Sequence, residues 1–279
     1  MKRWHKYQLN YKDKTRLFPK DSTFEDHKKS MQGYDSAEGY GSKEDFFKTH
    51  LYSAHPRHRH YHDYLMTHLE RSGSIFSIGS GLCANELLLV DAGFNIICSD
   101  LEQPCREETM RLFPRLRFVK YDVTQGPVPG NFDTVISLSM FYLFDDKQLA
   151  AVFKNIADGL RPGGTFILDP GGAEDNIGTR IIDDILYPLE IRSIRVLQRI
   201  LKKKERVVAK KHQGYRTTDA EIISIAGKAG FRLRGTEKYD YFTELGMKGV
   251  LFGTMPRRAI EFLGRAVPYI RMFNFRKEG

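Results

Sequence analysis

The chain has 279 residues, 41% of them hydrophobic and 28% charged, which is enough apolar material for one large or two modest cores and too much for general disorder. Three cysteines (Cys83, Cys98 and Cys105) cannot all pair and show no CxxC spacing, so a disulfide-stapled fold is excluded. The net charge of +9 is uneven: residues 51–190 carry 12 Lys/Arg against 19 Asp/Glu, and residues 191–279 carry 21 against 8. The central segment is therefore acidic and the C-terminal third basic.

The first 54 residues are expected to form an arm or lid. Residues 1–50 mix charge, Gly and aromatic residues without sustained periodicity before Lys43, which predicts an irregular arm followed by a short helix. Pro56 suits the first turn of a helix running to about residue 70, because a missing N–H costs nothing there, and Tyr61, Leu65 and Leu69 give that helix an apolar stripe.

From residue 74 short apolar runs alternate with helical patterns, which is typical of βα units and a parallel sheet. The expected strands are residues 75–78, 95–99, 117–121, 132–138 and 164–168. The expected helices between them are residues 84–92, which Gly93 closes, 106–112 and 147–160. Five strands joined by crossovers predict a doubly wound, Rossmann-like α/β sheet for residues 55–170.

The regular alternation ends after Asp169. Residues 171–215 read as a loop and then, over 181–204, as a basic helical insertion after the fifth strand. Thr217-Thr-Asp-Ala-Glu221 predicts a helix start with a hydroxyl cap and early acids. Residues 231–242 and 250–255 are expected to pair antiparallel, so that 216–255 complete a mostly parallel seven-stranded sheet. Residues 256–279 form a basic, roughly amphipathic C-terminal segment.

A glycine turn lies between the first expected strand and its helix. Gly79-Ser-Gly-Leu-Cys-Ala84 would let a ligand approach the backbone and would turn amide N–H groups toward it. Asp100 ends the second strand, where a carboxylate can accept hydrogen bonds from both hydroxyls of a ribose, and Asp122 follows the third. These positions meet at the carboxyl ends of the strands, where open α/β sheets bind ligands.

On these residues the chain resembles the class I S-adenosylmethionine-dependent methyltransferases, over about residues 55–170 and more loosely to 255. Besides the glycine turn, the matching stretches are Asn95-Ile-Ile-Cys-Ser-Asp100, Lys120-Tyr-Asp-Val123, Phe132-Asp-Thr-Val-Ile-Ser-Leu138 and Leu160-Arg-Pro-Gly-Gly-Thr-Phe-Ile-Leu168. The resemblance implies S-adenosyl-L-methionine as cofactor. The resemblance implies that Gly79, Ser80 and Gly81 contact the methionine part of the cofactor, Asp100 and Leu101 the ribose, and Asp122 and Val123 the adenine. It also implies that Leu138 contacts the inner side of the cofactor and that Arg59 contacts the cofactor's carboxylate.

Two departures from the family pattern stand in the glycine turn. The family usually has an acid where Ser77 stands, which bears on the cofactor's ammonium group, and a third glycine where Cys83 stands, which bears on packing.

An NAD-dependent oxidoreductase is the main alternative, because Gly79-x-Gly-x-x-Ala84 with Asp100 downstream also satisfies the dinucleotide fingerprint.

The expected reaction is methyl transfer to an oxygen or nitrogen of a small or medium-sized acceptor, which needs alignment and exclusion of water more than a nucleophilic residue. Where a general base assists, the candidates are His50, His55, Tyr142 and Asp169. Tyr142 follows the fourth strand and equally suits core packing, and Asp169 ends the fifth and equally suits a loop cap.

Six histidines, at positions 50, 55, 58, 60, 62 and 68, raise the question of a metal site. His55, His58 and His62 could share one helix face, yet no carboxylate or thiolate completes a ligand pattern and the interleaved Arg57 and Arg59 repel a cation. We therefore predict no metal.

The basic residues are compatible with more than one kind of binding partner. Residues 199–211 hold seven basic residues and one acid, which fits a solvated helix face or a phosphate-bearing partner. A nucleic-acid-directed methyltransferase or cofactor-binding platform is retained as an alternative to the small-molecule acceptor, although the fourth strand ends in Ser137-Leu-Ser-Met140 and no RNA module is evident. Peripheral membrane contact by the C-terminal segment is also retained, although Pro268 and Gly264 interrupt that segment. The oligomeric state is not predicted, and we expect a cytoplasmic protein, since the N-terminus lacks the apolar stretch of a secretory signal.

Overall fold

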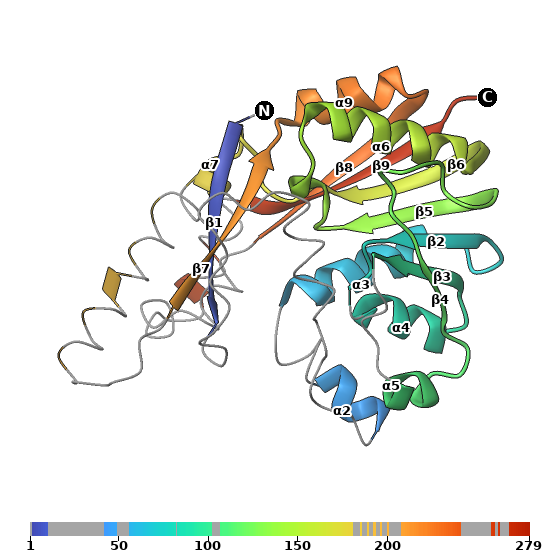
Figure 1. Cartoon of the computed structure of the whole chain (residues 1–279), viewed down its shortest axis with the longest axis horizontal. Coiled ribbons are helices and arrows are strands. Elements are labelled where there is room, and N and C mark those ends of the chain that lie inside the picture. Colours follow the sequence, from blue (N-terminus) through green and yellow to red (C-terminus); the bar gives the residue numbers. More distant parts are fainter. Residues whose placement is uncertain are drawn as a thin grey trace.

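The computed structural model describes residues 2–10, 42–48, 56–81, 83–101, 107–180, 208–240 and 268–279, together with single positions between 185 and 200 and at 258, 259 and 262. Its centre is a seven-stranded sheet with the order β4-β3-β2-β5-β6-β9-β8 (Figure 1). The strands are β2 (Ser74–Ile78), β3 (Asn95–Asp100), β4 (Arg117–Lys120), β5 (Phe132–Leu138), β6 (Leu160–Asp169), β8 (Phe231–Asp240) and β9 (Pro268–Lys277). All neighbours are parallel except β9, which is antiparallel to both β6 and β8. The predicted doubly wound, mostly parallel sheet is confirmed.

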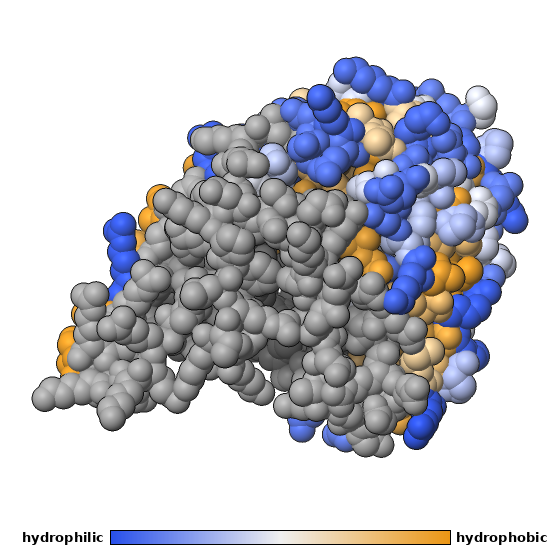
Figure 2. Space-filling model, in the orientation of Figure 1, coloured by the Kyte–Doolittle hydropathy of each residue, from blue (hydrophilic) through white to orange (hydrophobic). Residues whose placement is uncertain are grey.

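Helices cover both faces of the sheet. On one face α6 (Asp146–Asp158) and α9 (Asp219–Lys228) bury a cluster that includes Phe153, Phe166 and Phe275. On the other face lie α3 (Pro56–His68) and α4 (Ala84–Asp91), whose cluster takes the alternate strand positions such as Ile136 and Ile167. Figure 2 shows mainly hydrophilic side chains on the outside of the described surface, as expected of helices that turn one apolar side to a core.

Short elements complete this framework. They are α2 (Lys43–Phe47), α5 (Glu107–Leu112), the single 3₁₀ turn η2 (Phe141–Leu143) and α7 (Ile177–Arg180). The helix predicted after Lys43 is thus confirmed, and it packs Phe46 and Phe47 against Phe113, which follows α5.

The long helices begin where the sequence indicates. Asp145 and Gln148 form a capping box at α6, and Thr218 and Glu221 form a second one at α9, in which the Thr218 Oγ1 accepts from the Glu221 N–H at 3.1 Å. Gly93, with φ +92°, follows α4 as the predicted left-handed cap.

The N-terminal residues form a strand instead of the irregular segment predicted for them. β1 (Lys2–Asn10) pairs antiparallel with β7 (Val208–Arg216), from Lys2 opposite Arg216 to Asn10 opposite Val208. This ribbon stands beside the edge of the sheet to which β5 and β6 run, and β7 packs against η2 (Figure 1). Local sequence patterns could not predict this pairing, because the two strands are about 200 residues apart in the chain.

The last part of the C-terminal segment, which was expected only to be basic and roughly amphipathic, forms a strand. It is β9, an inner strand of the sheet, so residues 268–277 do not form a helix at a membrane surface. Ile270 and Met272 join the core on one face of the sheet, and Phe273 and Phe275 join the core on the other, which is the period of two that a strand has and a helix lacks. β8 pairs with β9, and the strand predicted over 250–255 lies outside the described residues.

Two further expectations concern the helical insertion and membrane-spanning helices. Within 181–204 the described positions Leu189, Arg192, Ser193, Val196 and Ile200 are helical, in line with the predicted insertion. None of the helices in the described part of the chain is long and apolar enough to cross a bilayer.

Candidate functional site

The glycine turn lies where β2 ends, beside the end of β3. Gly79 and Gly81 have φ of +69° and +53°, values that favour glycine, and Cys83 follows with φ +55°. The N–H of Ser80 donates to the carbonyl of Ser99 at 2.9 Å, so the turn is fastened to β3. A Cβ built on Gly79 would overlap the sulfur of Met140, whereas one built on Gly81 meets no atom within 4 Å. The turn is therefore closed on the Gly79 side and open at Gly81.

Asp100 is held against this turn by two backbone donors. Its Oδ2 accepts from the Gly81 N–H at 2.8 Å and its Oδ1 from the Leu101 N–H at 2.7 Å. Burial raises the pKa of Asp100, and these two hydrogen bonds oppose the rise. Because each carboxylate oxygen can accept a second hydrogen bond, Asp100 presents oriented acceptors at the sheet edge.

The end of β4 reaches the same edge. The Tyr121 N–H donates to the Asp100 carbonyl at 2.9 Å, which aligns the following residues with β3. Asp122 Oδ1 accepts from the N–H and the hydroxyl of Thr124 at 3.0 and 2.7 Å, and Val123 is buried. Asp122 thus shapes a local turn, directly after the bond by which Tyr121 joins this segment to Asp100.

A second group of residues gathers at the ends of β5 and β6. The N–H of Ser139, which follows Leu138, donates to the Asp169 carbonyl at 2.9 Å. The buried Asp169 carboxylate accepts from the Tyr61 hydroxyl and, at 3.0 Å, from the Gly171 N–H. A Cβ on Gly171 would lie 3.0 Å from the Tyr142 ring, so Tyr142 and the loop after β6 are in close contact. The predicted pair Tyr142 and Asp169 is brought together, with Asp169 also serving as the loop cap.

The histidines have separate surroundings. The predicted bases His50 and His55 lie outside the described residues. His60 stacks on Tyr239 at 5.1 Å, and His68 stacks on Tyr64 at 3.9 Å. No group of three or more His, Cys, Asp or Glu side chains able to hold a metal forms within the described segments. The exposed Arg59 lies on α3, whose Tyr61 reaches Asp169, so this part of the helix borders the same edge.

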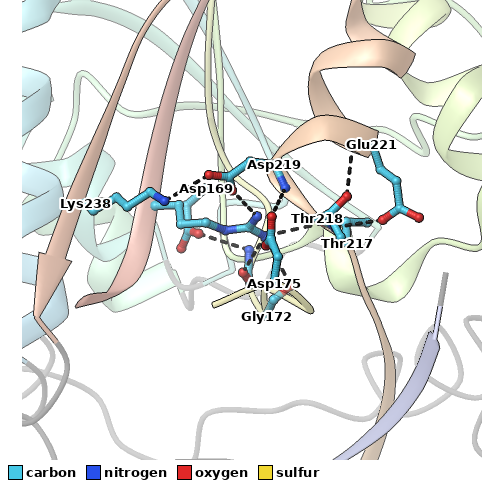
Figure 3. A network of polar contacts seen from close by, with 10 residues as sticks. Asp169, Gly172, Asp175, Thr217, Thr218, Asp219, Glu221 and Lys238 are labelled. Atoms are coloured by element: carbon cyan, nitrogen blue, oxygen red, sulfur yellow. Dashed lines mark hydrogen bonds and ion pairs between the residues drawn. The ribbon is translucent and has the colours of Figure 1, made fainter. Parts of the chain in front are cut away.

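A buried arginine network that the sequence did not indicate lies beside the loop after β6. Arg271 of β9 is fully buried and donates to Asp219 of α9 at 2.6 Å and to the carbonyls of Gly171 and Gly172 at 3.3 and 3.2 Å. Lys238 of β8 holds the other oxygen of Asp219 at 3.0 Å (Figure 3). Arg271 therefore fixes the loop after β6 from behind.

Glu86 in the first turn of α4 is the second residue that sequence reasoning missed. Its Oε1 accepts from the Ser77 hydroxyl at 2.6 Å, its side chain is buried, and its Oε2 has no hydrogen-bond partner among the described residues. Burial raises the pKa of Glu86 to about 7, and the nearby Asp100 charge adds to the rise. An acid at a helix N-terminus gives no signal by itself, since such residues ordinarily face water.

Two solved structures share this fold over most of the chain. One is a chain in the complex between the Haloferax volcanii Trm112 methyltransferase activator and a methyltransferase, with TM-score 0.55, 17% identity, and coverage of 80% of this chain and 91% of that one. The other is the Burkholderia thailandensis 1,6-didemethyltoxoflavin-N1-methyltransferase, with TM-score 0.54, 14% identity and coverage of 98% and 100%. At these identities the likeness establishes the fold alone. No curated protein sequence matches the chain.

A family model identifies the sheet's first five strands and their helices. Residues 75–164 match the model described as "Methyltransferase domain". In the doubly wound dinucleotide-binding fold the sixth strand lies next to the fifth, whereas here the antiparallel β9 lies between β6 and β8. The family match and the strand order both weigh against the alternative of an NAD-dependent oxidoreductase. Residues 75–164 thus match a methyltransferase domain, and they form the central strands of a sheet whose order differs from the dinucleotide-binding one.

Proposed function

We propose that the protein transfers a methyl group from S-adenosylmethionine to an oxygen or nitrogen of a small or medium-sized acceptor at the carboxyl edge of β5 and β6. The observation that carries this proposal is the contact between the Asp100 carboxylate and the Gly81 N–H, because it places an oriented ribose acceptor directly beside an open glycine turn. The residues present fit the cofactor: a turn with room at Gly81, two acids and a buried carboxylate oxygen without a partner among the described residues.

Each strand end would hold a different part of the cofactor. We assign the methionine part to the turn at Gly79, Ser80 and Gly81, with Arg59 directed at its carboxylate. Asp100 and Leu101 would hold the ribose, Asp122 and Val123 the adenine, and Leu138 the inner side. The backbone bonds from Ser80 to Ser99 and from Tyr121 to Asp100 keep these ends in fixed register, which supports binding without rearrangement of the sheet.

The acceptor would lie beside Tyr142, between the loop after β6 and the β1–β7 ribbon. β7 packs against η2, which carries Tyr142, and Ala173 forms a bridge with Thr217 next to the end of β7. Residues of the N-terminal arm and of the 171–215 segment therefore flank the place where a methyl group would be received, which supports their role as an enclosure.

The bound cofactor supplies an activated sulfonium methyl group, so the protein's contribution is alignment and exclusion of water. Tyr142 would orient an acceptor hydroxyl or amine through its own hydroxyl. Asp169, which already accepts from Tyr61 and Gly171, would fix the loop beneath the acceptor. His50 and His55 stay candidates for the proton acceptor by their place at the end of the arm.

Isothermal titration calorimetry with S-adenosylhomocysteine and with NAD tests this function. Wild-type protein should bind S-adenosylhomocysteine, and Asp100→Ala should lose that binding, whereas Asp158→Ala, which changes a surface carboxylate paired with Lys154, should retain it. Preferential binding of NAD, or unchanged affinity in Asp100→Ala, would overturn the proposal.

A further inference from the structure

A buried carboxylate oxygen lies at the base of the glycine turn. The Glu86 side chain is only 3% exposed, and its Oε2 has no hydrogen-bond partner among the described residues, while Oε1 is taken by Ser77. An unpaired oxygen of this kind costs free energy in a folded protein unless some group outside the chain satisfies it.

The electrostatic surroundings of Glu86 indicate the charge of that group. Among the described residues, the groups that act on its carboxyl are the hydroxyls of Ser77 and Ser80, its own backbone and the carboxylate of Asp100, and none of these is a cation. The Asp100 charge disfavours ionisation of the buried Glu86, and a bound cation would offset this repulsion. The site is therefore complementary to a positively charged hydrogen-bond donor.

The position of Glu86 relative to the turn indicates which part of the ligand brings that charge. Ser77, which donates to Glu86, lies in β2 two residues before Gly79, whereas Asp100 binds Gly81. In the proposed function Asp100 holds the ribose and the glycine turn holds the methionine part, so we assign the Ser77–Glu86 pair at the start of the turn to the amino-acid end of the cofactor, which carries an ammonium group.

We propose that Glu86 binds the cofactor's ammonium group through Oε2, with Ser77 holding Oε1 in place. This inference rests on the proposed function and adds a residue to it. The acid that binds the ammonium group thus comes from α4. The strand β2 contributes the hydroxyl of Ser77, which holds that acid in place.

Two probes separate the amino-acid end from the rest of the cofactor. S-adenosylhomocysteine carries the ammonium group, whereas 5′-methylthioadenosine keeps the adenosine and the thioether and lacks the amino acid. Calorimetric titration of Glu86→Gln should show affinity for S-adenosylhomocysteine reduced about tenfold or more, as loss of a charge-assisted hydrogen bond predicts, and unchanged affinity for 5′-methylthioadenosine.

The controls distinguish binding from folding. Asp91→Asn changes an exposed acid on the same helix, paired with Lys43, and should leave both affinities unchanged. Asp100→Ala should weaken both probes, because both contain the ribose. Ser77→Ala keeps the carboxylate and removes its hydrogen bond, so a smaller loss confined to S-adenosylhomocysteine is expected and tests the same point where Glu86→Gln fails to fold.

Two results would overturn the inference while leaving the proposed function intact. Either Glu86→Gln binds S-adenosylhomocysteine as tightly as wild type, or it loses both probes to the same extent. A wild-type protein that binds neither probe would remove the proposed function, and the assignment of Glu86 would fall with it.

Discussion

Substitution of Glu86 by Gln should stabilise the ligand-free protein above neutral pH. The pKa of Glu86 rises from 4.5 to about 7 because its carboxyl is buried, so the folded chain keeps a proton that the unfolded chain releases at lower pH. A tenfold difference in proton affinity is worth 1.36 kcal/mol, so the ionised carboxyl should cost the wild-type fold up to about 3 kcal/mol at pH 8. Gln carries no proton to lose and keeps the shape of the side chain.

The sign of the effect follows from the two pKa values. Between about pH 4.5 and pH 7 the folded state binds more protons at this site than the unfolded state, so the wild-type free energy of unfolding falls as pH rises. At pH 5 wild type and Glu86→Gln should differ little. At pH 8 the variant should be the more stable protein by up to about 3 kcal/mol.

Urea unfolding followed by circular dichroism at pH 5, 6, 7 and 8 measures this difference. Asp91→Asn, on the same helix, should follow the wild-type curve at every pH. Parallel curves for wild type and Glu86→Gln, or a variant destabilised at pH 8, would refute the burial argument. Saturating S-adenosylhomocysteine should reduce the variant's advantage at pH 8, because a bound ammonium group stabilises the ionised carboxylate only in wild type.

Two further substitutions test the framework around the site. Arg271→Met removes the buried donor that the partly buried Asp219 carboxylate shares with Lys238, and two loop carbonyls lose it as well, so the free energy of unfolding should fall by about 1–3 kcal/mol. Lys238→Met, which removes the exposed partner of the same carboxylate, should cost less than about 1 kcal/mol in the same urea titration, and equal losses would contradict the role of burial. Gly79→Ala forces a side chain into φ +69° and against Met140, so the thermal midpoint of this variant should fall. The control Gly235→Ala should melt like wild type, because no described atom lies within 4 Å of the added carbon. A Gly79→Ala variant that also melts like wild type would show that the turn can relax.

The local features of the fold were predictable from the sequence. β5 runs over the residues predicted for it, because a short stretch with β-branched residues at its centre, Val135 and Ile136, suits a strand that is covered on both faces. The start of α9 at Thr218 follows from a hydroxyl and an acid three residues later, which satisfy each other's backbone donors. The placement of Asp100 beside the glycine turn follows from parallel strands whose carboxyl ends meet at one edge.

The failures have one physical origin. The strand β9 was not predicted, because Arg271 interrupts its apolar pattern. The buried charge has its partners elsewhere in the chain, in Asp219 and two loop carbonyls. In the same way Ser77 was noted as a missing acid, while Glu86, nine residues later, lies against it in the folded chain.

The sequence by itself determined the βα alternation, the glycine turn and the acids at the strand ends, because spacing along one chain segment encodes each of them. Only the tertiary structure decided that the first strand pairs with β7, that the last strand enters the sheet beside β6, and that Glu86 stands behind Ser77. Those features depend on which distant side chains satisfy a buried polar group, and distance along the chain does not reveal distance in the fold.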